Sequence, residues 1–302
     1  MIRLAGAGVI AALALGPLAP AQDQVPQFKS ESELVVVHVL VTDRSGAYIS
    51  GLTLDDFRLF DETRPQTPKF FLNEDAPVTV GLVIDSSGSM GHVRDRVIAA
   101  AAEFVESSNP EDEVFALVFN DNVQKALGGQ FTSDPRVLRS ALVNAFQPVG
   151  RTALYDAVVE GLEYATKGSR DRRVLVVLSD GGDNASQATL KDVVTKVQSS
   201  NTVIYSVALE DPYDADANPG KLRQLSDASG GESFSPKDVL EVRKDFQKIA
   251  RDVRHMYTIG FEPMNTAYHA GFHRLRVDVK TADGRRLSVH SRTGYLKAHV
   301  GP

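Results

Sequence analysis

The chain has 302 residues, of which 42% are hydrophobic and 24% charged, a composition typical of a globular protein long enough for two domains. The formal net charge is −6, and the chain has no long run of Lys or Arg. Aromatic residues are also not interleaved with basic ones. Both features argue against nucleic acid or an anionic membrane surface as partner. The chain contains no cysteine, which excludes disulfides, zinc–thiolate sites and a thiol-linked lipid anchor.

The first 21 residues have the pattern of an export signal. Arg3 precedes an apolar, Ala-rich run over residues 4–15, and Ala19-Pro20-Ala21 offers the small residues that signal peptidase reads. The run is too short to cross a bilayer and lacks the polar spacing of a buried amphipathic helix. We therefore predict removal of residues 1–21 and export to the periplasm or secretion, with no transmembrane segment in the mature chain.

Residues 22–75 show strand patterns without helices. Residues 34–41 are β-branched and nearly all apolar, and a turn follows at 43–46. Residues 57–61 alternate in polarity, and Phe70-Phe71 indicate a further strand. This β segment has too few strands to bury a sheet face by itself.

Strands and helices alternate between residues 76 and 255. Continuous apolar runs predict buried strands at 78–84, 114–119, 174–178 and 203–208. Apolar residues at helical spacing predict helices within 97–105, 138–146, 154–165, 190–197 and 239–253. This alternation predicts a mostly parallel sheet covered on both faces, which is a doubly wound α/β domain.

Strand patterns return in residues 256–302. Apolar and charged residues alternate strictly over 274–280, and Asp283-Gly284 supplies a turn before another alternating stretch. Because neither terminal segment can bury a face alone, we predict that 22–75 and 256–302 pair in one small β-sandwich-like domain, with the α/β domain inserted between them. Two separate appendages on the central domain are the alternative.

Oxygen-bearing side chains gather in three loops of the α/β domain. The first predicted strand ends in Asp85-Ser86-Ser87-Gly88-Ser89, whose D-x-S-x-S spacing brings three such side chains to one side of a turn. Alone, this cluster would suit a helix N-cap. However, Thr152 precedes another helix and Asp180 follows another strand, and these loops share the carboxyl edge where doubly wound folds bind ligands.

On these residues the region 76–255 resembles a von Willebrand factor type A (VWA) domain, the fold also found in integrin inserted domains. In that family the D-x-S-x-S loop, a Thr and an Asp form a metal-ion-dependent adhesion site, or MIDAS. The resemblance implies that the metal ligands, some through water, are Asp85, Ser87, Ser89, Thr152 and Asp180. The whole chain also resembles exported bacterial proteins in which such a domain sits between short β segments.

The donor chemistry agrees with a MIDAS. Carboxylate and hydroxyl oxygens are hard ligands, which favours Mg²⁺, with Mn²⁺ or Ca²⁺ as alternatives. Two carboxylates neutralise the charge of a dication, and three hydroxyls add ligands without adding negative charge. The ion therefore keeps its affinity for one more anionic oxygen. We therefore expect a protein ligand presenting Asp or Glu, and a role in protein binding or cell adhesion.

Three charged residues near these loops have more than one interpretation. Arg151 stands where many relatives have Gly, and it either favours an acidic ligand or points to solvent. Asp156 is an acceptor for a loop hydroxyl or a capping residue, and Asp183 is expected to cap the following helix. His92 is expected to be a helix-start residue.

Other candidate sites are weaker. Residues 214–220 resemble the opening of a calcium loop, but the Gly comes one place late and Leu225 stands where a bidentate Glu is needed, which favours an acidic surface loop. The loops offer no His–carboxylate pair, and the chain has no G-x-S-x-G or P-loop motif. We expect no enzyme activity; a scaffold with non-essential metal binding is the alternative, and a metal-dependent hydrolase is less favoured.

Overall fold

A computed structural model describes residues 34–209, 216–263, 270–281, 284 and 286–297. The predicted export signal, residues 1–21, lies outside the described residues. Within the described part of the chain, no helix combines the length and apolar character needed to cross a membrane.

The α/β domain is built on one six-stranded sheet. Its strands lie in the order β10 (Ser233–Phe234), β9 (Thr202–Ala208), β8 (Arg172–Ser179), β5 (Val78–Asp85), β6 (Glu113–Phe119) and β7 (Val123–Lys125). Neighbouring strands are parallel except for β6 and β7. The apolar runs read from the sequence are the four central strands, which are almost wholly buried because helices cover both of their faces.

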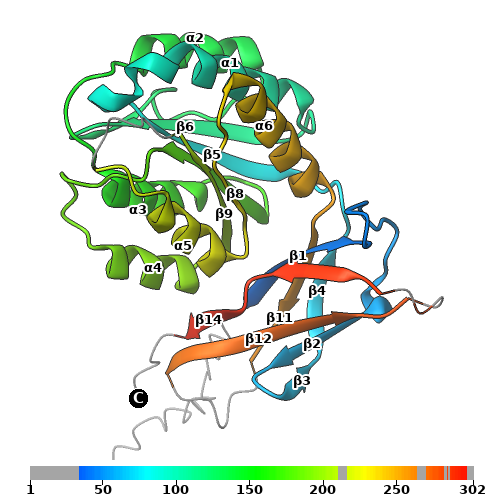
Figure 1. The fold of residues 1–302 in the computed structure, drawn as a ribbon. Coiled ribbons are helices and arrows are strands. Elements are labelled where there is room, and N and C mark those ends of the chain that lie inside the picture. The colour runs from blue at the N-terminus through cyan, green and yellow to red at the C-terminus, as the bar shows by residue number, and fades with distance from the viewer. Residues whose placement is uncertain (1–33, 210–215, 264–269, 282–283, 285, 298–302) are drawn as a thin grey trace, which may run out of the picture. The chain divides into compact units, whose positions relative to one another are not determined.

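Three helices pack on each face of this sheet (Figure 1). One face holds α1 (Arg94–Ser107), α2 (Pro135–Ala145) and α6 (Val239–Arg254), and the other holds α3 (Leu154–Ala165), α4 (Leu190–Ser199) and α5 (Pro219–Ser229). Helix α5 is not among the helices predicted from the sequence, because the residues that precede it resemble an acidic loop. Leu222 and Leu225 nevertheless anchor it, since both side chains are fully buried at helical spacing.

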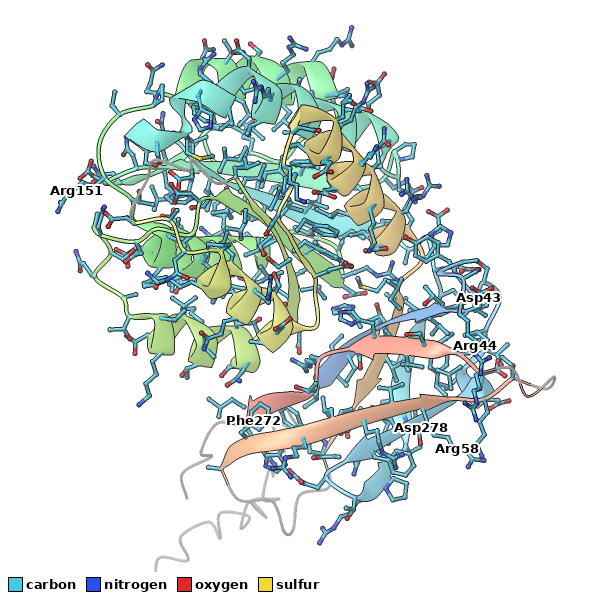
Figure 2. The ribbon with its side chains drawn as sticks, in the orientation of Figure 1. Asp43, Arg44, Arg58, Arg151, Phe272 and Asp278 are labelled. Carbon is cyan, nitrogen blue, oxygen red and sulfur yellow. The ribbon has the colours of Figure 1, made fainter. Side chains whose placement is uncertain are left out.

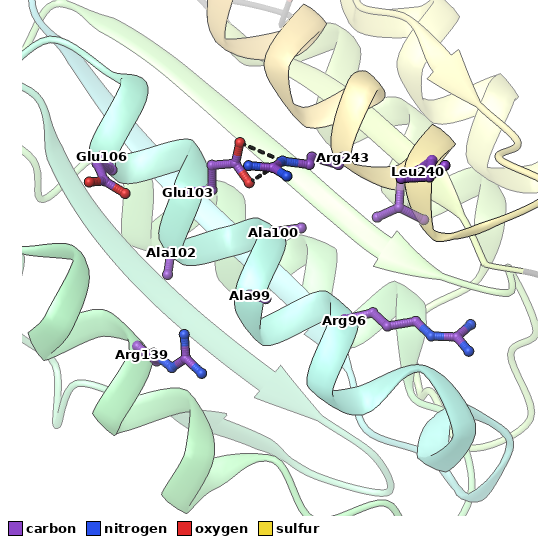
Figure 3. Close-up of a pocket in the computed structure, with 10 residues that line it drawn as sticks. Arg96, Ala99, Ala100, Ala102, Glu103, Glu106, Arg139, Leu240 and Arg243 are labelled. Atoms are coloured by element: carbon purple, nitrogen blue, oxygen red, sulfur yellow. Dashed lines mark hydrogen bonds and ion pairs between the residues drawn. The ribbon is translucent and has the colours of Figure 1, made fainter.

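Helix α6 is fastened beside α1 and leads the chain out of the domain. Arg243 of α6 and Glu103 of α1 point toward one another (Figure 3), and the Arg243 Nε lies 2.7 Å from the Glu103 carboxylate. Gln247 donates a second hydrogen bond to Glu103, and Phe246 packs edge-on against Phe104. These contacts set the point at which the chain returns to strands.

Two antiparallel sheets combine strands from both ends of the described chain. One has the order β13 (Ser288–Ser291), β1 (Val35–Thr42), β11 (Tyr257–Phe261) and β4 (Pro68–Leu72); the other has β14 (Gly294–Lys297), β12 (Gly271–Val279), β2 (Phe57–Asp61) and β3 (Arg64–Gln66). The two sheets share one hydrophobic core. The predicted fold class, a mostly parallel α/β domain between terminal β segments that form a sandwich, is confirmed.

A chain of buried polar groups joins the α/β domain to the β-sandwich. Arg172, at the start of β8, donates hydrogen bonds to the carbonyls of Asn73 and Val253 and to the Thr258 hydroxyl. That hydroxyl lies 3.0 Å from Nδ1 of His38, whose Nε2 lies 3.0 Å from the Asn201 carbonyl. Because a carbonyl oxygen only accepts, Nε2 carries the proton and Nδ1 accepts from Thr258.

Candidate metal centre

Three loops meet at the carboxyl edge of the six-stranded sheet. Asp85 is the last residue of β5, Asp180 directly follows β8, and Thr152 stands two residues before α3. The loops are bonded to one another, because Gly88 donates its backbone N–H to Gly150 and the Asn184 side chain accepts from the Thr152 backbone. The five predicted ligands thus lie on three adjoining loops.

Four of the predicted ligands form one hydrogen-bonded cluster. The Ser89 hydroxyl donates to Oδ2 of Asp180 at 2.8 Å, and the Ser87 and Ser89 hydroxyl oxygens lie 3.1 Å apart. Asp85 accepts at Oδ1 from the Ser87 backbone N–H at 2.8 Å, so the D-x-S-x-S loop folds back over its own first carboxylate. These contacts join the D-x-S-x-S loop to Asp180 on the loop after β8.

Thr152 is held through its backbone rather than its side chain. Its N–H donates to Oδ1 of Asn184 at 2.9 Å, and its carbonyl accepts from the N–H groups of Asn184 and Ala185. No described residue hydrogen-bonds the Thr152 hydroxyl, although the residue is 6% exposed. Hydrogen bonds from the neighbouring loop therefore hold the Thr152 backbone, and its hydroxyl is available to a ligand.

The two carboxylates are buried, and no described residue pairs either of them with a positive charge. Asp85 is 0% exposed and Asp180 is 2% exposed. Each hydrogen bond they accept comes from a neutral donor: the Ser179 hydroxyl and Ser87 N–H for Asp85, and the Ser89 hydroxyl and Gly182 N–H for Asp180. Burial, with a smaller contribution from the Asp180 charge, raises the pKa of Asp85 to about 6.

This donor set fits a hard divalent cation. Two buried carboxylates with only neutral donors leave a negative charge that a dication would neutralise, and the adjoining hydroxyls are ligands suited to Mg²⁺. Among the described residues no group of three or more Asp, Glu or His could hold a metal ion. A cation at this edge would therefore depend on Ser87, Ser89 and Thr152 beside Asp85 and Asp180.

Arg151 points toward solvent at the rim, with its side chain 67% exposed, and pairs there with Asp121. Figure 2 shows it projecting from the outer edge of the loop before α3. Its Nε lies 2.9 Å from Oδ1 of Asp121, and its backbone N–H donates to Oδ2 of the same carboxylate at 2.9 Å. Asp121 thereby fixes the loop that carries Thr152.

The expectation for Asp183 is wrong, whereas for Asp156 the structure favours the capping alternative. Asp183 does not cap the following helix α4, whose N-cap is Thr189; it accepts from the Tyr155 N–H in the first turn of α3 and from the Ser186 hydroxyl. Asp156 accepts from the backbone N–H groups of Gln187 and Ala188 rather than from a loop hydroxyl. Both carboxylates make hydrogen bonds that join α3 to the loop after β8. The partners are far apart in the chain, so no local sequence pattern predicts these contacts.

Three residues that support the cluster were not singled out from the sequence. Ser179 donates to Oδ2 of Asp85 at 2.6 Å and also accepts from the Gly181 N–H. Asn184 holds Thr152, and Asp121 holds Arg151. The sequence feature that could have identified these residues is their position, because each lies at or after the carboxyl end of a strand. Residues 214 and 215 of the calcium-like stretch lie outside the described residues; of the others, Gly220 lies within α5 and Leu225 is buried.

Comparison with known proteins gives one family. The model of the von Willebrand factor type A domain matches residues 79–250. No curated protein matches the chain. Similar solved structures include an aerotolerance-related membrane protein from Bacteroides fragilis, with 15% identity, TM-score 0.47, and 58% of this chain and 98% of that chain covered.

Two other solved structures are similar to this chain. The vWF domain of a type V pili tip protein from Porphyromonas gingivalis has 13% identity and TM-score 0.46, covering 59% of this chain and 95% of that one. A von Willebrand factor type A protein from Catenulispora acidiphila has 14% identity and TM-score 0.49, covering 79% and 73% respectively.

Proposed function

Because the chain belongs to the von Willebrand factor type A domain family, we propose that it is an exported, adhesion-type module that binds an acidic group of a protein partner through a divalent cation at a MIDAS. The observation that carries the proposal is the pair of buried carboxylates, Asp85 and Asp180, whose hydrogen bonds all come from neutral donors. When bound, the cation supplies an electrophilic centre for a partner's Asp or Glu.

Each ligand has a separate role in this proposal. Asp85 and Asp180 supply the formal charge that holds the cation, and the hydroxyls of Ser87, Ser89 and Thr152 fill positions without adding charge. Thr152 also decides partner affinity, because its loop forms the rim with Arg151. The proposed periplasmic or secreted location rests on residues 1–21, and the proposed absence of enzyme activity rests on the lack of a His–carboxylate pair in these loops.

The first test measures cation binding. Isothermal titration with Mg²⁺, Mn²⁺ and Ca²⁺ should give one site in the parent protein and none in Asp85→Ala, since the hydroxyls cannot replace the lost charge. Asp95→Ala is the matched control, because Asp95 is an exposed carboxylate on α1 with a side chain 93% exposed, and it should bind as the parent does.

The second test measures partner capture from extracts in Mg²⁺ and in EDTA. EDTA and Asp85→Ala should each abolish capture, whereas Thr152→Ala should weaken capture more than it lowers the melting temperature. Capture that is unchanged both in EDTA and with Asp85→Ala would overturn the proposal, and would leave the domain as a scaffold in which metal binding is not essential.

A further inference from the structure

A cavity lies where the β-sandwich meets the α/β domain, separate from the candidate metal centre. Its volume is about 450 Å³, which is within the range of small-molecule sites. Leu40 and Thr42 of β1 and His290 of β13 line it from the sandwich, and Tyr205 of β9 and the last turns of α6 line it from the α/β domain. Both halves of the protein therefore contribute to its wall.

A partly neutralised cluster of charges lines this cavity. Lys248 Nζ lies 2.6 Å from the Glu232 carboxylate and 2.9 Å from Oδ2 of Asp252. The Tyr48 hydroxyl donates to Oδ1 of Asp252 at 2.5 Å. One ammonium thus faces two carboxylates, and the lining keeps a formal charge of −1.

The Tyr205 hydroxyl is a buried polar group of this lining that has no hydrogen-bond partner among the described residues. Tyr205 is 2% exposed and lines the cavity, and no described residue hydrogen-bonds its hydroxyl. Buried phenol hydroxyls ordinarily find a hydrogen-bond partner. Burial, followed by the charges of Asp252 and Glu232, raises the pKa of Tyr205 well above its ordinary value, so the hydroxyl keeps its proton and can both donate and accept.

The surroundings of Tyr205 select the charge of a ligand. An anion would lie against Glu232 and Asp252, and the Lys248 ammonium already bonds to both carboxylates. A small organic cation, by contrast, would neutralise the remaining charge. Its N–H groups would find carboxylate and phenol oxygens, and its carbon chain would pack on Leu40 and the tyrosine rings.

We propose that this cavity binds a small primary alkylammonium ion, held by the Tyr205 hydroxyl and the Asp252 and Glu232 carboxylates. The site is independent of the candidate metal centre, which lies at the carboxyl edge of the sheet and uses none of these residues. A bound amine would touch β1 and α6 together, so it would also stabilise the junction between the two β-rich ends of the chain and the α/β domain.

Titration of the whole mature protein with butylammonium tests the proposal. Isothermal titration, run once in EDTA and once in Mg²⁺, should give the same dissociation constant, about millimolar for a ligand this small. Butanol and butyrate, which share the carbon chain but lack the positive charge, should not bind. Butylammonium should also raise the melting temperature.

Conservative variants assign the binding to this cavity. Tyr205→Phe keeps the ring and removes the hydroxyl, and should weaken butylammonium binding about 10-fold. Asp252→Asn should weaken it as well. Tyr164→Phe removes a hydroxyl on the opposite face of the sheet and should change nothing. The proposal is overturned if butylammonium binds no better than butanol, or if Tyr205→Phe and Tyr164→Phe bind it equally well.

Discussion

His38 is a buried imidazole whose surroundings keep it neutral. Burial is the main cause and the Arg172 charge the next, and together they lower the pKa of His38 from 6.5 to about 3. Both ring nitrogens are nevertheless satisfied, by Thr258 and by the Asn201 carbonyl. The neutral state of His38 in β1 therefore depends on Arg172 of β8, and its ring is held by the Asn201 carbonyl just before β9.

This residue predicts a dependence of stability on pH. Between pH 6.5 and about 3 the unfolded chain binds a proton that the folded chain does not, so stability present above pH 6.5 is lost as the pH falls. At pH 5 the loss from His38 is about 2 kcal/mol. His38→Gln keeps an N–H donor but cannot titrate, and should lack this part of the loss.

Urea unfolding of the parent and of His38→Gln at about pH 7.5 and about pH 5 gives the free energy of unfolding of each protein at each pH. The contribution of His38 is the loss on acidification in the parent minus the loss in the variant. At the higher pH the imidazole is neutral in both the folded and the unfolded chain, so that pair of measurements isolates the packing cost of the substitution. An equal loss of stability on acidification in the two proteins would contradict the assignment to His38.

At the scale of elements, the loop before α3 is shaped by contacts from another loop. Gly150 has φ of +83°, and a Cβ there would lie 2.1 Å from Oδ2 of Asp121, so the position requires glycine. Asp121 accepts from the backbone and side chain of Arg151, while Ala153 donates to the Asn120 carbonyl. Hydrogen bonds from the turn after β6 thus hold the conformation of the loop that carries Thr152.

We predict that Asp121→Ala weakens Mg²⁺ binding about 10-fold, because outer residues that orient ligands typically contribute on that order. The melting temperature should change little, since the Arg151 side chain of the pair is 67% exposed. Asp278→Ala removes the carboxylate of an exposed Arg–Asp pair in the sandwich and is the matched control. Equal Mg²⁺ affinity in the two variants would show that the contact does not position Thr152.

At the scale of the whole molecule, strands from both ends of the described chain complete each other's sheets. β1 pairs with β11 along one edge and with β13 along the other, and β2 pairs with β12. The hydrophobic core of the sandwich therefore contains residues from both sides of the α/β insertion. The α/β domain has its own two cores, one on each face of its sheet.

This arrangement predicts the result of a truncation after His255. The shortened chain would lose β11 to β14, leaving β1 with two unpaired edges and an uncovered apolar face, and it should aggregate. Light scattering and size-exclusion chromatography measure the outcome, with a truncation after Lys297 as the control. A soluble, fully folded chain ending at His255 would contradict a shared sandwich.

Local patterns in the sequence determined the fold class, and the resemblance to a VWA domain implied the five candidate ligands. Continuous apolar strands between amphipathic helices predict a parallel sheet, and a parallel sheet places its strand ends at one edge. That rule alone puts Asp85 and Asp180 at the same edge of the sheet, and the strand order β8-β5 found in the structure makes their loops neighbours. The D-x-S-x-S spacing adds Ser87 and Ser89, because it is a property of five consecutive residues. Metal binding by these residues stays a prediction.

Tertiary structure alone decided which distant groups meet. Asp183 caps α3 instead of α4, Asp121 fixes Arg151, and Tyr205, Lys248 and Tyr48 share one cavity, although each pair is separated by many residues or by a whole domain. Such contacts depend on how helices and sheets pack, and packing leaves no periodic signal in the chain. The sequence therefore determines where strands end and which oxygens gather there, while the packed fold decides which of those groups are buried, paired or left for a ligand.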